Sequence, residues 1–241
     1  MTILLEICVD DADGLIAAHE GGADRIELCS ALELGGLTPQ LSLMRLAARL
    51  PIPSYAMIRP RAGDFVLSPA DLEAMLADID TVREAGLAGV VLGANLGDGR
   101  LDEALLTRLV AHADGLGMTL HRAFDLVPDI RPAVEFAVEC GFERILTSGG
   151  MTKAVDGIVQ LQETVAAAAG RISIMPGSGV TAETVGAILA AGPFREVHSS
   201  ASGHVASAGG KAETLGFATP QRRITSAEKV AALKAAIVTM A

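Results

Sequence analysis

Several short apolar runs in this sequence contain, or end in, a residue that can do chemistry. A charged side chain inside an apolar strand is costly unless it faces a site or a partner. Because side chains alternate along a strand, residues two apart share a face. We therefore expect the polar members of these runs to line one pocket. The residues expected there are Glu6, Glu27, Arg59, His121 and His198.

Acid–base chemistry is one use for such a pocket. His121 is a candidate acid–base group, oriented by Asp125 or by a carboxylate of the pocket, with Glu6 or Glu27 as the second titrating group. The candidate catalytic residues are Glu6, Glu27, Arg59, His121 and Asp125. The alternative is an internal network of ion pairs and hydrogen bonds that only satisfies itself.

Anion binding is a second use. Arginine offers a forked donor for carboxylate or phosphate, and glycine-rich turns before helices can present successive amide groups to an anion. Two such turns lie at 147–150 and 176–181. The alternative is two tight turns that need glycine for positive φ. The candidate anion-binding residues are Arg59, Arg61, Arg122, Ser148, Gly149, Gly150, Gly177, Ser178 and Gly179.

The cysteines indicate a third chemistry. Cys8 and Cys29 each follow a glutamate by two residues, in runs predicted to be neighbouring strands about 4.8 Å apart. Two thiolates at matched positions suit a soft cation such as Cu(I), whereas the sequence lacks the C-x-x-C spacing typical of zinc sites. The alternative is that both are small apolar core residues, and Cys140 is expected to be structural.

The elements that position these residues are eight predicted strands alternating with helices. The length of 241 residues and this alternation predict a single (β/α)8 TIM barrel over 1–241, in which all carboxyl ends of the strands lie on one rim. An open doubly wound sheet is the alternative, but no G-x-G-x-x-G follows the first strand. The expected strands are Ile3–Val9, Arg25–Leu28, Ser54–Ile58, Val90–Gly93, Thr119–His121, Arg144–Leu146, Ser173–Met175 and Glu196–His198.

Boundary signals and one long connection complete the expected organisation. Thr38-Pro39 and Ser68-Pro69 are typical of helix N-caps followed by proline. Gly86, Gly117 and Gly141 are expected to follow helices. Residues 199–225, rich in Gly, Ala and Ser, are expected to form a long loop that is either a lid or mobile.

Composition excludes several classes of function. Half of the residues are hydrophobic, and the formal net charge of −10 argues against nucleic acid and anionic membranes as partners. An odd, sparse set of three cysteines predicts a reducing compartment rather than a disulfide framework. No apolar run is long enough to span a bilayer. We therefore expect a cytoplasmic protein.

Several long and unusual motifs run through the sequence from the first predicted strand to the last. They are Leu5–Asp10, Gly21–Cys29, Leu34–Pro39, Met57–Arg61, His121–Asp125, Ile145–Gly150, Ile174–Gly177 and Glu196–His198. Together these motifs resemble the CutC family. The resemblance implies a TIM barrel, a cytoplasmic location, a role in copper homeostasis and Cu(I) binding, and no agreed enzymatic activity accompanies it. Ala62 and Leu67 depart from the family pattern, and the match is poor after Ser202.

Two hypotheses from different classes follow. The first is a protein that binds or handles copper through Cys8 and Cys29, with copper(I) as the cofactor. The second is a TIM-barrel enzyme that acts on a small anionic metabolite, such as a phosphorylated one, at the carboxyl rim. The expected partners are copper or a small anionic ligand, and a homo-oligomer is left open.

Overall fold

The computed structural model describes residues 2–240, and its centre is a sheet of eight parallel strands. The strand order is β7-β6-β5-β4-β3-β2-β1-β8, and β7 also contacts β8, which brings the two ends of the sheet together. This confirms the predicted (β/α)8 barrel. The strands are β1 Leu4–Val9, β2 Arg25–Leu28, β3 Ser54–Met57, β4 Gly89–Leu92, β5 Gly117–Leu120, β6 Arg144–Thr147, β7 Ser173–Pro176 and β8 Glu196–Ser199.

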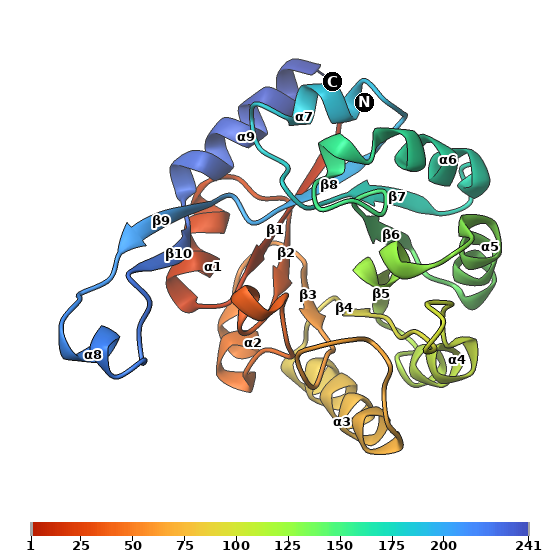
Figure 1. Cartoon of the computed structure of the whole chain (residues 1–241), viewed down its shortest axis with the longest axis horizontal. Coiled ribbons are helices and arrows are strands. Elements are labelled where there is room, and N and C mark those ends of the chain that lie inside the picture. The colour runs from red at the N-terminus through yellow and green to blue at the C-terminus, as the bar shows by residue number, and fades with distance from the viewer. Residues whose placement is uncertain (1, 241) are drawn as a thin grey trace.

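Helices surround the strands (Figure 1). The α-helices are α1 Ala12–Glu20, α2 Leu41–Ala47, α3 Pro69–Ala85, α4 Glu103–His112, α5 Ile130–Cys140, α6 Ile158–Ala168, α7 Val185–Leu189, α8 Lys211–Thr214 and α9 Ala227–Met240. Three 3₁₀ turns, η1 Leu32–Leu34, η2 Arg122–Leu126 and η3 Ala154–Asp156, lie in connections that follow strands.

The boundary signals were right at some elements and wrong at others. Ser68 caps α3 through a capping box with Asp71, with Pro69 in the first turn, as predicted. Gly86 and Gly141 follow α3 and α5 with positive φ. Thr38 does not cap α2. Its hydroxyl donates to Asp78 instead, and α2 begins at Leu41. Gly117 begins β5 rather than ending a helix.

The strands bury two different faces. The outward face carries branched aliphatic residues, such as Ile7, Ile26 and Val90, that pack against the helices in one continuous core. The inward face carries a small apolar cluster of Cys29, Tyr55, Met57 and Val91, and otherwise mostly polar side chains. A structural barrel interior is normally filled by branched aliphatics, so this polar interior needs an explanation.

The segment 199–225, expected to be a long loop, contains regular structure. Ser202–Ala206 (β9) and Gln221–Thr225 (β10) pair antiparallel, and the short α8 lies between them. This hairpin, residues 202–225, is called the arm below. It projects away from the barrel at the left of Figure 1, with β10 in contact with α1. Among residues 2–240, no helix is long and apolar enough to cross a membrane.

Candidate functional site

The middle of the barrel holds a network of paired charges. Arg25, the first residue of β2, donates to Glu6 of β1 and to Glu196, the first residue of β8. Arg144 of β6 reaches Glu196 at 3.1 Å and donates to Thr119 at 2.9 Å. These side chains are almost inaccessible to solvent, with Glu6 at 0% and Arg25 at 3% exposure. Each of these buried charges therefore has an opposite charge beside it, as buried charges require.

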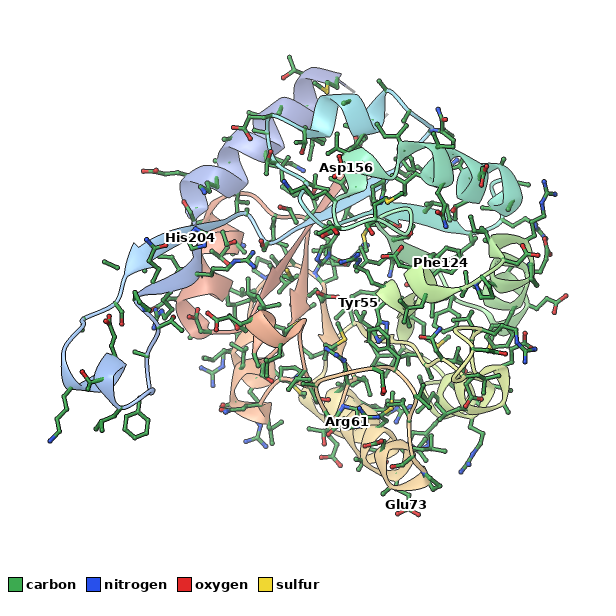
Figure 2. The ribbon with its side chains drawn as sticks, in the orientation of Figure 1. Tyr55, Arg61, Glu73, Phe124, Asp156 and His204 are labelled. Atoms are coloured by element: carbon green, nitrogen blue, oxygen red, sulfur yellow. The ribbon has the colours of Figure 1, made fainter. Side chains whose placement is uncertain are left out.

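Tyr55 of β3 lies between the two arginines, in the middle of the ring of strands in Figure 2. The guanidinium carbons of Arg25 and Arg144 are 5.4 Å and 4.9 Å from the centre of its ring. Its hydroxyl donates to Glu143 at 2.8 Å. Gly89 and Gly117 leave the space that this ring occupies, because a Cβ at either position would lie within 2.5 Å of Tyr55 atoms. This part of the interior is a packed, self-satisfied core.

A different cluster lies nearer the carboxyl ends of β1, β2 and β8. One donor atom from each of Cys8, Glu27 and His198 lies within 4.8 Å of the other two, and all three residues are buried. The strand register brings them together, because Cys8 lies opposite Glu27 and Glu6 lies opposite His198. A thiol, an imidazole and a carboxylate at this separation can share one metal ion.

Glu6 fixes the orientation of the imidazole in this cluster. Burial works against ionisation of Glu6, but Arg25 and His198 outweigh it and lower the pKa to about 2. An ionised carboxylate only accepts hydrogen bonds, so His198 Nδ1 donates to Glu6 Oε1 at 2.8 Å. His198 Nε2 then faces Glu27, 3.7 Å away. A carboxylate behind a histidine is the usual support of a metal-binding imidazole.

Glu27 is the member of the cluster with a carboxylate oxygen that has no hydrogen-bond partner in the described chain. Burial raises its pKa to about 7, and only the nearby His198 and Arg25 and the Cys29 thiol oppose this. Its Oε2 accepts from the Cys29 thiol at 3.6 Å, while its Oε1 is buried without a hydrogen-bond partner in the described chain. The group is therefore ready to accept another donor or a cation.

The matched spacing of the two strands in the sequence suggested that Cys29 lies beside Cys8. The structure does not place them opposite each other. The register of β1 and β2 places Cys8 beside Glu27, so Cys29 lies one inward position farther toward the rim. Burial, followed by the charge of Glu27, raises the pKa of the Cys29 thiol well above its ordinary value. Cys29 is thus a neutral donor to Glu27 in this structure, and its service as a copper ligand stays a prediction.

Arg59 follows β3 at the rim and has no carboxylate partner among residues 2–240. The residue is 6% exposed, and in the described chain its guanidinium donates only to the carbonyl oxygens of Leu34, Gly36 and Gly63. Its Nε has no partner in the described chain. The ring of Phe65 lies 4.9 Å from its central carbon. A buried cation held only by neutral carbonyls still lacks its anion.

His121 follows β5 and lies against the same aromatic ring, with ring centres 4.8 Å apart. Its Nδ1 accepts from the Ala123 amide at 3.1 Å, so the proton of a neutral ring lies on Nε2, which has no partner in the described chain. Burial, then the charge of Arg59, lowers its pKa to about 3. His121 is therefore a neutral hydrogen-bond donor at neutral pH.

Asp125 does not orient His121, which corrects one expectation. Its carboxylate instead accepts from the Thr147 hydroxyl at 2.6 Å, and from the amides of Ser148 and Gly150 at 3.1 Å and 3.2 Å. Arg122 pairs with it at 2.7 Å. The turn 147–150 does bind an anion, but in this structure the anion is the side chain of Asp125. These amides are thus not free for an external ligand, and phosphate binding at this turn is not supported by the geometry.

The second glycine-rich turn, 176–181, is held by hydrogen bonds within the chain. The Gly177 amide donates to Thr147 in the sheet, and the Ser178 hydroxyl donates to the Thr152 carbonyl at 2.8 Å. Ser178 has φ of 76° and Gly179 has φ of 69°. Gly177 is needed for packing, since a Cβ there would lie 2.4 Å from Leu146 and 3.2 Å from His198.

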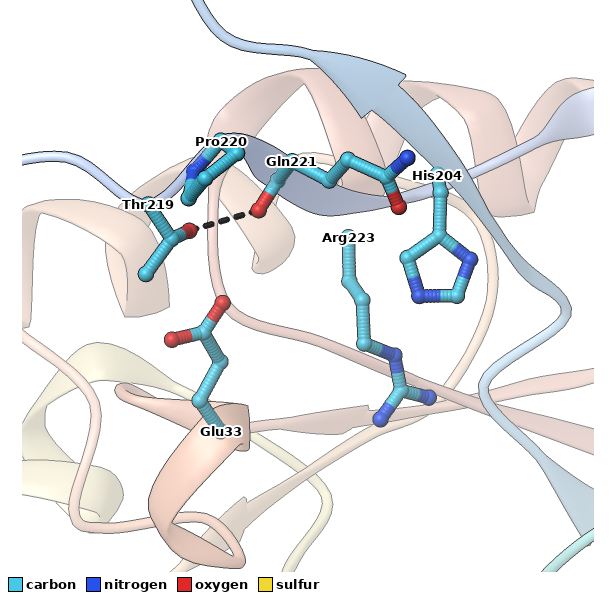
Figure 3. A pocket seen from close by; sticks show the side chains of 6 residues that line it. All are labelled: Glu33, His204, Thr219, Pro220, Gln221 and Arg223. Atoms are coloured by element: carbon cyan, nitrogen blue, oxygen red, sulfur yellow. Dashed lines mark hydrogen bonds between the residues drawn. The ribbon is translucent and has the colours of Figure 1, made fainter. Parts of the chain in front are cut away.

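A cavity of about 540 Å³ lies apart from these clusters, between η1 and the arm. Figure 3 shows Glu33 of η1 on one side and His204 and Arg223 of the arm on the other. Arg223 donates to the hydroxyls of Ser200 and Ser202 at 3.1 Å and 2.8 Å, which ties the arm to the end of β8. The cavity is lined by Glu33, His204, Thr219, Pro220, Gln221 and Arg223.

The structure therefore divides the predicted pocket into two groups. Glu6, Glu27 and His198 lie together with Cys8, whereas Arg59 and His121 meet around Phe65. Arg61 lies outside both, paired with Asp64 and Asp71 on the surface. The sequence argument missed Arg25, Arg144 and Asn95, and it left Glu196, which shares a strand face with His198, out of the site residues. Parity would have found Arg25, which shares its strand face with Glu27, but nothing in the sequence showed that Asn95 is buried.

Similar proteins were found in sequence comparisons. A model described as the CutC family matches residues 3–203. The family protein CutC of Sinorhizobium medicae is 59% identical over 239 residues, covering 99% of this chain and 98% of that protein. The family protein CutC of Caulobacter vibrioides is 52% identical over 239 residues, covering 97% of this chain and 98% of that protein.

A search of solved structures also finds a CutC protein. A candidate copper homeostasis protein CutC from Streptococcus agalactiae matches with a TM-score of 0.79 and 31% identity, covering 83% of this chain and 99% of that one. Deoxyribose phosphate aldolase from Aeropyrum pernix matches with a TM-score of 0.63 at 17% identity, covering 81% and 85% of the two chains. The second likeness shows the fold alone.

Proposed function

The chain belongs to the CutC family, and from this premise and the geometry of the barrel we propose that it binds Cu(I) at Cys8 and His198, beside Glu27. The single observation that supports the proposal is the approach of three donor atoms to within 4.8 Å of one another at a buried site. The related Streptococcus agalactiae protein is described as a candidate copper homeostasis protein, which makes copper the metal to test first.

The donor set fits Cu(I) in part. Thiolate and imidazole are ligands that Cu(I) accepts, and Cys8 and His198 supply one of each. Carboxylate is a harder ligand, so Glu27 is better suited to balancing charge or to holding a proton than to binding the ion directly. Cys29 donates to this carboxylate at 3.6 Å and is the nearest alternative sulfur ligand.

The residues of the chain have separate tasks in this proposal. Cys8 and His198 bind the ion, and each must release a proton to do so. Glu6 is a positioning residue, because its bond to Nδ1 leaves Nε2 as the ligand atom. The burial of the cluster keeps water away and favours a low coordination number. As cargo, a reduced copper ion also agrees with three free cysteines and with a cytoplasmic location.

The test is a titration of the full chain against a Cu(I) chelator of known affinity. We expect Cys8→Ser and His198→Gln each to weaken Cu(I) binding by a factor of ten or more. Cys140→Ser is the matched control, because Cys140 lies at the end of α5, away from the cluster, and it should leave the affinity unchanged.

Two further variants separate the ligand sets. If Cys29→Ser weakens binding as much as Cys8→Ser, the two sulfurs share the ion and the role assigned to His198 is reduced. Glu6→Gln should weaken binding less than His198→Gln, since it removes the orientation but keeps the ligand. Unchanged affinity in a Cys8→Ser/His198→Gln double variant would exclude this site.

A further inference from the structure

Buried polar atoms without partners are concentrated in one part of the molecule. In residues 2–240, five buried side-chain atoms lack a hydrogen-bond partner: Glu27 Oε1, Ser54 Oγ, Arg59 Nε, Asn95 Oδ1 and His121 Nε2. Four of these residues lie in the carboxyl half of β2 or just after β3, β4 and β5. This is the rim on which TIM-barrel enzymes place their active sites.

Three of the four surround Phe65. Arg59 and His121 lie 4.9 Å and 4.8 Å from the centre of its ring, measured from the guanidinium carbon and the imidazole centre. The backbone N–H of Asn95 donates to the Phe65 carbonyl at 2.9 Å. Two of the partnerless atoms are donors, on Arg59 and His121, and one is an acceptor, on Asn95. We call Arg59, Asn95 and His121 the rim triad.

Native proteins seldom leave such atoms unsatisfied, because each loses its bonds to water and gains nothing in return. The other side chains near the triad do not resolve the deficit. The side-chain nitrogen of Asn95, Nδ2, already donates to the carbonyls of Gly99 and Ala123, at 2.7 Å and 3.1 Å. The side-chain oxygen, Oδ1, is therefore the atom without a partner. The deficit therefore defines what is missing: an anionic acceptor for two donors, with a hydroxyl or similar donor for Asn95.

We propose that the rim triad binds a small hydroxycarboxylic acid such as glycerate. The carboxylate accepts from Arg59 Nε and from His121 Nε2, and a hydroxyl group of the ligand donates to Asn95 Oδ1. A carboxylate also supplies the negative charge that the buried Arg59 guanidinium lacks, because its Nη atoms contact only carbonyl oxygens.

Entry to this site requires movement of the segment that covers it. Phe65 lies in the connection between β3 and α3, and the neighbouring residues Ala62, Gly63 and Asp64 are exposed. Gly63 also accepts from Arg59 Nη2 at 2.7 Å, so this connection is tied to the residue that would receive the carboxylate. The ligand therefore enters beneath the tip of this connection and replaces no ion pair when it does so.

The site does not depend on the metal proposal, because it uses neither Cys8 nor His198. Lys153, Lys211, Lys229 and Lys234, the lysines of the chain, all lie outside the eight barrel strands. The proposal is therefore one of binding by hydrogen bonds and charge, without a Schiff base on a strand lysine.

The test is isothermal titration calorimetry with D-glycerate, supported by thermal-shift measurements. Glycerol is the matched probe, because it keeps the hydroxyl groups and lacks the carboxylate. We expect glycerate to bind at millimolar concentration or below and to raise Tm, and glycerol to do neither. His121→Phe keeps an aromatic ring against Phe65 but removes the Nε2 donor, and should weaken glycerate binding about tenfold.

Arg59→Lys keeps the charge but loses the Nε donor, and should weaken binding by at least as much. Arg61→Lys is its control, because Arg61 pairs with surface carboxylates, and it should change nothing. If Arg59→Lys does not fold, His121→Phe alone decides. Absence of binding by glycerate, glycolate and lactate would overturn the proposal. Equal binding of glycerol would overturn it too, because the carboxylate would then not be recognised. Unchanged Cu(I) affinity in His121→Phe would show that any failure here is separate from the metal site.

Discussion

The amino and carboxyl ends of the barrel strands differ in how their buried, ionisable side chains are paired. Arg25, Arg144 and Glu196 each begin a strand, and each is paired with an opposite charge. Arg59 and His121 follow the ends of their strands, and each has a buried atom without a partner. Both regions are polar and hidden from solvent, so burial and charge alone do not distinguish structure from function. The difference is whether the hydrogen bonds close within the chain.

This contrast also separates what each region can do. A closed network resists change, because removing one member leaves another charge unpaired. An open set of donors and acceptors is tolerable only if water, an ion or a ligand completes it. The cluster of Cys8, Glu27 and His198 lies between these extremes, with its imidazole oriented by Glu6 and one oxygen of Glu27 still free.

The largest effect is expected where the network is closed. Arg25→Met removes the shared partner of Glu6 and Glu196 and leaves two carboxylates buried together. Breaking a buried ion pair in this way typically costs about 3–5 kcal/mol. Denaturant unfolding at neutral pH should show a loss of this size. A loss below about 1 kcal/mol would mean that the network is not an essential part of the core.

A smaller effect is expected at the turn that binds its own carboxylate. Asp125→Ala leaves the Ser148 and Gly150 amides and the Thr147 hydroxyl without their acceptor. Unsatisfied buried groups of this kind cost about 1–3 kcal/mol, as measured by denaturant unfolding. The variant also vacates an anion site, so inorganic phosphate should raise its Tm but not that of the unaltered chain. Equal protection of both would show that phosphate binds elsewhere.

The pH dependence of stability should report His121. Its folded pKa of about 3 lies below its ordinary value of 6.5, so the unfolded chain takes up a proton first as pH falls. The contribution of His121 to stability is therefore complete above pH 6.5 and is lost as pH falls toward 3. The slope approaches about 1.4 kcal/mol per pH unit inside this window.

The check is to compare unfolding free energies of the unaltered chain and His121→Phe across that range. The variant should lose stability less steeply with acid, while the contribution from Glu6, whose pKa is lowered to about 2, remains in both. Parallel curves would show that His121 takes up its proton equally readily in the folded and unfolded chain, and so that its imidazole is not held neutral by burial.

The sequence predicted local features well and pairing between strands poorly. Each of the eight strands was placed to within one or two residues, because runs such as Ile26–Leu28 between turn residues are a local signal. Parity also placed Glu6, Glu27 and His198 on one face. The matched spacing of Cys8 and Cys29 was misleading, since their relative height depends on the stagger of the barrel, which no local pattern encodes. Likewise, Asp125 lies 22 residues from Thr147 in sequence, and their contact is tertiary.

The smallest effect is expected at Arg61, and it sharpens the comparison from the solvent side. Arg61 carries the same guanidinium as Arg59 two residues away, and has carboxylate partners in Asp64 at 3.1 Å and Asp71 at 3.2 Å. Its side chain is 40% exposed, so water and salt screen these pairs. Arg61→Met should therefore leave the midpoint of denaturant unfolding almost unchanged, with any difference shrinking further in high salt. Arg59→Met removes a cation that has no such partners, so it should act on ligand affinity more than on ion pairing. Arg61 is both the more exposed and the better paired of the two arginines. If Arg61→Met instead destabilised the chain more than Arg59→Met, exposure would fail as a guide to how much each arginine contributes to stability, whereas pairing would not.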